Sequence, residues 1–232
     1  MPPKAQALPK HIGFIMDGNR RWAREHGLST LEGHRRGYLN MRRVLQLCLD
    51  RGVKVVTVFA FSAENWNRSK REIGYLMRLF AEAVKNQLAE FDEKNVRLNI
   101  IGRLEGLPAS LQRQLKSAME KTKANTRAVL NMAVNYGGRA EIVDGVKRLV
   151  SKGLKVAQLD EQALGRALYA GDMPDPDLII RTSGEQRLSG FLLWEAAYAE
   201  LYFTPKKWPE FSEIELDKAL ADYANRKRNF GA

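Results

Sequence analysis

Short β-branched runs alternate with longer amphipathic stretches along this 232-residue chain, and this alternation limits the folds open to it. The runs have the length of buried strands, whereas the stretches between them repeat their apolar residues at helical spacing. Strands that alternate with helices form a mainly parallel sheet with helices on both faces. We therefore predict an α/β fold with a central six-stranded sheet. Its strands are expected over residues 12–16, 53–60, 96–102, 128–135, 178–182 and 200–203.

The amphipathic stretches predict seven helices. Ser69 and Glu72 have the spacing of a capping box at the start of the third. No internal repeat and no linker interrupts the pattern, so we predict one domain over residues 1–232, with residues 1–10 as a flexible N-terminal tail. The helices are expected from about residue 20, then over 33–50, 69–93, 107–124, 139–152, 160–169 and 214–230.

The single cysteine, Cys48, falls on the apolar face of a predicted helix, so we expect it in the core. One thiol provides no disulfide framework and fits a reducing compartment. No apolar run is as long as a membrane span, and the N-terminus has no signal-peptide pattern. We therefore expect a cytoplasmic protein.

The chain carries 38 Lys and Arg against 27 Asp and Glu, a net charge of +11. Such a charge indicates an anionic partner, which could be nucleic acid, an acidic membrane surface or a phosphorylated substrate. The basic residues are scattered along the chain, with no single basic stripe and no recognisable nucleic-acid-binding motif. We therefore expect no nucleic-acid partner.

The loop Asp17-Gly18-Asn19 ends the first predicted strand and leads directly into a helical pattern that begins with Arg20 and Arg21. Free backbone N–H groups and the helix dipole make such a junction a ready anion site. Asp17 would repel a bare diphosphate, so it fits best as a ligand for a metal ion that rides on the phosphates. An ordinary Asp-Gly turn is the alternative interpretation.

Polar loops follow most of the other predicted strands, and ligands of parallel sheets bind beyond the carboxyl ends of the strands. Any one arginine in these loops would more often be a surface residue, but four at one sheet edge indicate a polyphosphate site. His34 begins the second helix near the first loop and could also touch a phosphate. Apolar residues that flank the loops are either core or the wall of a tunnel. The loops contain Arg21, Arg68, Arg181 and Arg187, with Ser62, Asn65, Ser183 and Ser189.

Six motifs together resemble the cis-prenyltransferases, and most closely the bacterial undecaprenyl diphosphate synthases. They occur in the family's order from about His11 to Phe230. They are M-D-G-N-R-R-W-A (16–23), G-H-x-x-G (33–37), A-F-S-A-E-N-W-N-R (60–68), N-Y-G-G-R (135–139), R-T-S-G-E-Q-R-L-S-G-F (181–191) and W-E-A-A-Y-A-E-L-Y-F (194–203).

This resemblance implies a homodimer that condenses isopentenyl diphosphate repeatedly with an allylic diphosphate, here farnesyl diphosphate, with Mg²⁺ as cofactor. The product would be a medium-to-long Z-polyprenyl diphosphate such as undecaprenyl diphosphate, held in a hydrophobic tunnel with Ala60 on its wall. A peripheral contact with the inner membrane surface would serve product release. A short-chain or irregular cis-prenyl diphosphate synthase is the alternative within the family. A non-catalytic subunit is disfavoured, because Asp17, Arg181, Arg187 and Glu200 are all present.

The resemblance also assigns roles to single residues. Asp17 and Asn65 are expected to be catalytic, and Asp17 and Glu200 to bind the metal. Gly18 to Arg21 would form the allylic diphosphate loop, and residues 62–68 the loop that closes over the substrates. The substrate-binding residues are then Gly18, Asn19, Arg20, Arg21, Trp22, His34, Ser62, Trp66, Arg68, Arg181, Arg187 and Ser189.

Three positions depart from the family pattern. Ser29-Thr30 stands where many members carry Pro-Arg, and that arginine helps to hold the allylic diphosphate. Arg20 or Arg35 could compensate for its loss. Gly190 stands where Asn is usual, and Arg20 where some members have glycine.

Overall fold

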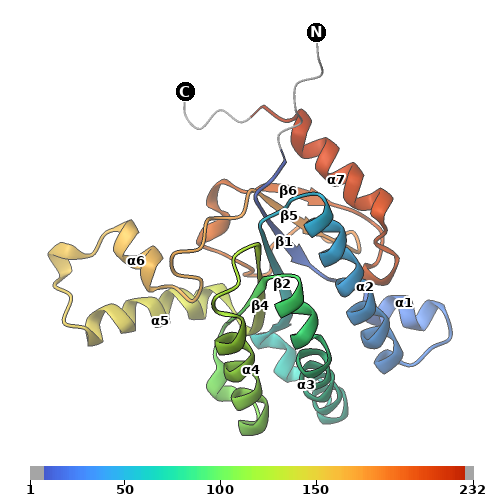
Figure 1. The fold of residues 1–232 in the computed structure, drawn as a ribbon, viewed down its shortest axis with the longest axis horizontal. Coiled ribbons are helices and arrows are strands. Elements are labelled where there is room, and N and C mark those ends of the chain that lie inside the picture. The colour runs from blue at the N-terminus through green and yellow to red at the C-terminus, as the bar shows by residue number, and fades with distance from the viewer. Residues whose placement is uncertain (1–7, 228–232) are drawn as a thin grey trace.

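The computed structural model describes residues 8–227. Its centre is a six-stranded sheet in the order β3-β4-β2-β1-β5-β6, in which every pair of neighbours is parallel (Figure 1). The predicted α/β fold is therefore confirmed. The strands are β1 (His11–Ile15), β2 (Val55–Ser62), β3 (Val96–Ile101), β4 (Ala128–Tyr136), β5 (Leu178–Arg181) and β6 (Glu200–Phe203).

Seven α-helices occur within the described residues, and several begin at a capping side chain, as the sequence pattern predicts. The hydroxyl of Ser69 accepts the backbone N–H of Glu72 at the start of α3, but the Glu72 carboxylate turns to other partners instead of closing a capping box. The helices are α1 (Asn19–Glu25), α2 (Thr30–Asp50), α3 (Lys70–Glu93), α4 (Ala109–Thr122), α5 (Gly138–Ser151), α6 (Glu161–Ala167) and α7 (Glu213–Asn225).

The element bounds differ from the predicted ones mainly at their ends. Helix α2 begins at Thr30 and not at Gly33, because the Ser29 hydroxyl accepts the backbone N–H of Glu32. Helix α7 ends at Asn225, and residues 228–230 of the longer predicted helix lie outside the described residues. Most of the predicted N-terminal tail, residues 1–7, lies outside them too, whereas the backbone N–H of Lys10 donates to Asp177 (2.7 Å).

The two faces of the sheet carry two separate apolar clusters, because successive strand side chains point to opposite faces. The larger cluster joins Ile12, Phe14 and Ile180 to side chains of α2, α3, α4 and α7, and it includes fully buried Cys48. The smaller cluster gathers Ile15, Tyr136, Phe191 and their neighbours on the other face. Helices α5 and α6 extend to one side of the sheet (Figure 1). Within residues 8–227 no helix is long and apolar enough to cross a membrane.

Candidate active site

An ion pair between the ends of β1 and β5 forms the centre of the candidate site. Ile15 pairs in register with Arg181, so the next residues of β1 bring Asp17 beside the Arg181 guanidinium. Oδ2 of Asp17 accepts a hydrogen bond from Nη2 of Arg181 (2.9 Å), and Oδ1 accepts from the backbone N–H of Gly18 (2.8 Å). The Arg181 side chain is only 4% exposed and also donates to the Ser189 hydroxyl (2.9 Å) and to the carbonyl of Arg187. Two predicted residues thus meet at the expected edge of the sheet.

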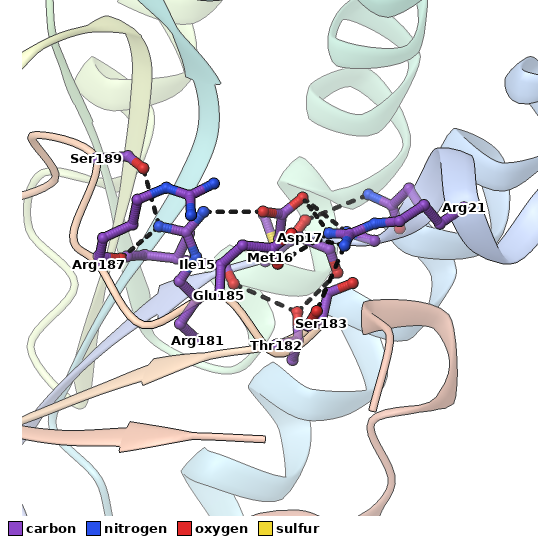
Figure 2. A network of polar contacts seen from close by, with 12 residues as sticks. Ile15, Met16, Asp17, Arg21, Arg181, Thr182, Ser183, Glu185, Arg187 and Ser189 are labelled. Carbon is purple, nitrogen blue, oxygen red and sulfur yellow. Dashed lines mark hydrogen bonds and ion pairs between the residues drawn. The ribbon is translucent and has the colours of Figure 1, made fainter. Parts of the chain in front are cut away.

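Arg21 lies on the other side of Asp17, at 3.6 Å from its Oδ1 (Figure 2). Its guanidinium forms a two-point contact with Glu185, at 2.6 and 2.9 Å. The hydrogen bond from Arg21 holds the pKa of Glu185 below its ordinary value. Asp17 therefore stands between two groups of arginines, Arg181 with Arg187 on one side and Arg21 on the other. Sequence reasoning missed Glu185, because no local pattern shows that residues 164 positions apart will pair.

Three glycines of the motifs are explained by close approaches to this loop. Gly18 has a φ of +100°, and a Cβ atom there would lie 2.6 Å from the Ser183 hydroxyl. A Cβ on Gly33 would meet the backbone oxygen of Asn19 at 2.4 Å, and one on Gly37 would meet Oδ1 of Asn19 at 2.3 Å. The G-H-x-x-G motif thus lets α2 pack directly against α1, and this contact fixes the loop that carries Asp17.

A cavity of about 800 Å³ opens beside this loop. Eight of the predicted site residues line it, and Arg24, Thr30, Phe59 and Ala60 line it as well. Asp17 is the only carboxylate among its lining residues, against four arginines, so the cavity favours an anion. The predicted residues in its wall are Asp17, Gly18, Asn19, Arg20, Arg21, His34, Asn65 and Arg68.

Two residues of this wall, His34 and Arg68, share buried Glu72 as a hydrogen-bond partner. Oε1 of Glu72 lies 2.9 Å from Nε2 of His34 and 3.0 Å from Nη1 of Arg68. Burial lowers the pKa of His34 below its ordinary value, so the ring is neutral at pH 7. Burial would raise the pKa of Glu72, but the hydrogen bond from His34 and the charge of Arg68 outweigh it and lower that pKa. The ionised carboxylate thereby holds both predicted residues in place.

Other predicted residues lie outside the cavity wall. Trp22 stacks on His26, four residues further along the chain, with ring centroids 4.3 Å apart. The two residues lie on one helix face, and Arg21, the neighbour of Trp22, faces another direction. Trp66 donates its indole N–H to Oδ1 of Asn135 (2.7 Å) and lines a separate groove between α3 and α4. Ser62 ends β2, where its backbone N–H donates to the side chain of Asn65 (3.3 Å). The loop over residues 62–68 therefore presents Asn65 and Arg68 to the cavity, and its other predicted residues elsewhere.

Glu200 lies at the opposite end of the sheet from Asp17 within one chain. It begins β6 and pairs in register with Leu178, whereas Asp17 contacts Arg181 at the far end of the same strand pair. An ion pair holds its carboxylate 2.5 Å from Arg226. No three His, Cys, Asp or Glu side chains of residues 8–227 gather where they could hold a metal ion.

Asp17 alone nevertheless fits a magnesium ion, because Mg²⁺ usually binds one or two carboxylates together with substrate phosphates. Its side chain is 37% exposed, and each oxygen has accepted a single hydrogen bond at normal distance. Further lone pairs of the carboxylate are free to coordinate.

The departures from the family pattern have structural explanations. Arg35 forms a two-point contact with Glu32 and does not line the cavity, whereas Arg20 and Arg24 do. Arg24 was missed in the sequence, although its spacing of four residues from Arg20 places both on one helix face. Gly190 has a φ of +76°, in the left-handed region that Asn and Gly both adopt. The change from Asn therefore keeps the loop conformation.

The cavity continues into a narrow apolar space between α2, α3 and the sheet, which we call the α2–α3 seam. Met16, Asn19, His34, Ala60 and Leu76 line both spaces. The seam has a volume of about 70 Å³ and is also lined by Gly37, Tyr38, Met41, Leu79, Phe80, Ala83, Met132 and Trp208. The site thus joins a cationic mouth to an apolar extension.

The chain is similar in sequence to known proteins. A family profile described as "Putative undecaprenyl diphosphate synthase" matches residues 15–231. An isoprenyl transferase of Heliobacterium mobile is 48% identical over 228 residues, which cover 97% of this chain and 88% of the relative.

Two solved structures have the same fold. Lavandulyl diphosphate synthase from Lavandula x intermedia, in complex with dimethylallyl diphosphate, has a TM-score of 0.93 at 36% identity, covering 97% of this chain and 99% of its own. A probable undecaprenyl diphosphate synthase from Campylobacter jejuni has a TM-score of 0.81 at 34% identity, with the same two coverages.

Proposed function

This chain belongs to the cis-prenyltransferase family and is a prenyltransferase, and we propose that it condenses isopentenyl diphosphate repeatedly with an allylic diphosphate, farnesyl diphosphate, in a Mg²⁺-dependent reaction. Asp17 carries this proposal. Its carboxylate lies between two groups of arginines at the mouth of a cavity that continues into an apolar seam. Two diphosphates and one hydrocarbon chain need those three environments.

The residues divide between the two diphosphates. Arg20, Arg21 and Arg24, on one side of Asp17, would hold the allylic diphosphate. Arg181, Arg187 and Ser189, on the other side, would hold isopentenyl diphosphate (Figure 2). Guanidinium groups suit this task because they pair with phosphate oxygens in a two-point geometry. Binding of the allylic diphosphate requires Arg21 to exchange Glu185 for phosphate oxygens.

Asp17 would hold Mg²⁺ together with phosphate oxygens, and the ion, when bound, neutralises the charge that builds on the departing diphosphate. The arginines add fixed positive charge to the same leaving group, and charge that is already oriented stabilises a transition state most strongly. Asn65, whose amide is anchored to the backbone of Ser62, would orient the reacting end of isopentenyl diphosphate.

The direct test is product analysis. Purified protein incubated with labelled isopentenyl diphosphate and farnesyl diphosphate should form a medium-to-long polyprenyl diphosphate such as undecaprenyl diphosphate, and a chelator should abolish the reaction. The seam supports chain growth, because each methylene-sized group buried there contributes roughly 0.8 kcal/mol. An absence of condensation with every allylic primer would overturn the proposed function.

A short-chain or irregular synthase is the second candidate, and the size of the seam favours it. An engineered cavity of about 150 Å³ in another protein binds benzene. The seam, at about 70 Å³, is smaller, so a long product requires α2 and α3 to move apart. Dimethylallyl diphosphate as the sole substrate distinguishes the candidates, since an irregular synthase would form a ten-carbon product from it.

A homodimer and a peripheral membrane contact are also part of this proposal. Many of the exposed large apolar side chains fall in one part of the chain, from α5 to just before β6. This supports a dimer interface formed by that part and predicts a dimer mass in light scattering. The excess of basic residues supports contact with an anionic membrane, testable by vesicle co-sedimentation. The exposed residues are Val143, Val150, Val156, Leu159, Leu193 and Tyr198.

A further inference from the structure

A pair of polar side chains interrupts the apolar space between α2 and α3. Nε2 of Gln87 on α3 donates a hydrogen bond to the hydroxyl of Tyr38 on α2 at 2.5 Å. Gln87 is only 4% exposed, and burial raises the pKa of Tyr38. Met41, Ala83 and Met132, which also line the seam, carry apolar side chains. The two residues therefore satisfy one another.

The pair lies between two cavities. Tyr38 lines the α2–α3 seam, which begins at the diphosphate cavity. Gln87 lines a second, largely apolar cavity of about 40 Å³ further along the same two helices, with Leu45, Leu49 and Phe91 in its wall. No residue lines both cavities. The Tyr38–Gln87 pair is thus the point at which the space between α2 and α3, adjacent in Figure 1, is divided.

Helices α2 and α3 are held together beyond the pair as well. Arg42 and Glu90 form an ion pair at 2.8 Å, and Lys94 contacts the same carboxylate at 2.6 Å. These contacts bound the far cavity on its outer side, where all three residues line it. The far cavity therefore offers room for additional hydrocarbon only if the dividing pair yields.

We infer that the Tyr38–Gln87 hydrogen bond is a latch that sets the product length of this enzyme. This inference rests on the proposed function, in which the growing chain enters the seam from the diphosphate end. The apolar end of the chain advances toward the pair with each condensation. To pass, it must separate buried Gln87 from partly buried Tyr38, and a buried polar group that loses its hydrogen-bond partner lowers stability. Growth stops when that cost exceeds the gain from burying another isoprene unit.

The test compares product lengths of variants with and without the latch. Gln87→Ala and Tyr38→Ala join the two cavities, so their products from farnesyl diphosphate and labelled isopentenyl diphosphate should be longer than those of the wild type by at least one isoprene unit. Gln87→Met keeps the volume and removes the amide, so it should also lengthen the product if the smaller side chains prevent folding. Folding is checked by circular dichroism and thermal unfolding.

Gln114→Ala is the matched control. Nε2 of Gln114 donates to the carbonyl of Ala81 (2.6 Å), so the variant removes a similar contact of α3 from outside the seam. Its product distribution should equal that of the wild type. An unchanged distribution in the folded latch variants, or an equal shift in Gln114→Ala, overturns the latch while the proposed function stands. A wild type that forms no condensation product overturns the proposed function, and the latch with it.

Discussion

The two faces of the sheet are built from the same six strands, yet they differ in how tightly they are packed. The face under α2 and α3 contains the α2–α3 seam and the far cavity beyond it. The other face is filled by stacked aromatic rings, with Phe59 and Phe191 4.9 Å apart, and by a buried pair of carboxyl groups. The first face contains apolar space beside the site, and the second supports the loop that carries Ser189. Asp17 stands at the edge where both faces end.

Replacement of Asp17 should have the largest effect on activity, because it removes the carboxylate at the edge of the sheet where both faces end. For Asp17→Ala we expect kcat to fall by about 10³-fold or more, as for loss of a central electrostatic group. The fold should persist, since the Asp17 side chain is 37% exposed. Steady-state kinetics with thermal unfolding measures both. Glu25→Ala removes an exposed carboxylate that pairs with Lys207 outside the cavity and should stay near wild type. Activity of Asp17→Ala within a few-fold of wild type would contradict the assignment.

The next largest effect should separate the two sides of Asp17. Each arginine offers charge-assisted hydrogen bonds of about 1.5–3 kcal/mol, or roughly a 10- to 150-fold change in KM. Arg181→Ala and Arg187→Ala should raise the KM for isopentenyl diphosphate, whereas Arg21→Ala should raise that for the allylic substrate. Arg35→Ala, outside the cavity, is the control. Equal effects on both substrates from all three variants would show that the two sides are one site.

A smaller effect on the reaction is expected from narrowing the α2–α3 seam. Ala60 lines both the diphosphate cavity and the seam, so Ala60→Leu should shorten the product distribution. Overpacking a filled wall costs about 1–3 kcal/mol, and that cost falls on the longest products first. Chromatography of labelled products measures the shift. Ala60→Ser, which adds a single oxygen, should change little, and an unchanged distribution in Ala60→Leu would remove Ala60 from the product path.

Changes on the sheet face filled by aromatic rings should have the smallest effect on activity. They should alter the free energy of unfolding instead. Burial and repulsion from Glu141 raise the pKa of Glu195 from 4.5 to about 8. Glu195 therefore binds a proton more readily in the folded protein than in the unfolded chain between these values, and its contribution to the free energy of unfolding should fall as pH rises from about 4.5 to about 8. The slope should reach at most about 1.4 kcal/mol per pH unit. Denaturant unfolding at several pH values measures it.

Glu195→Gln should flatten this dependence, because the amide cannot ionise. Free energies of unfolding of the wild type and Glu195→Gln that differ by the same amount at every pH over this interval would contradict the raised pKa. The two carboxylates differ in their surroundings: Asp17 has two arginines within 3.6 Å, whereas neither oxygen of Glu195 has a hydrogen-bond partner among the described residues.

The sequence by itself determined the sheet and the edge at which its loops meet, and it predicted Asp17, Arg21 and Arg181 as site residues. Strand and helix periods are local properties, and parallel strands bring their carboxyl ends to one edge whatever the side chains are. The motifs likewise identified the family. The predicted bounds of helices differed from the observed ones, because a single capping group such as Ser29 moves the start of a helix by several residues.

Only the tertiary structure decided which side chains meet. Segments far apart in the chain meet in the ion pair between Arg21 and Glu185 and in the hydrogen bond between Tyr38 and Gln87. The pairing of β6 with β5 likewise places Glu200 at the opposite end of the sheet from Asp17. The direction in which Trp22 and Arg24 face depends on how α1 packs against its neighbours. Such contacts depend on the distances between packed elements, and those distances follow from the whole core and not from any local pattern.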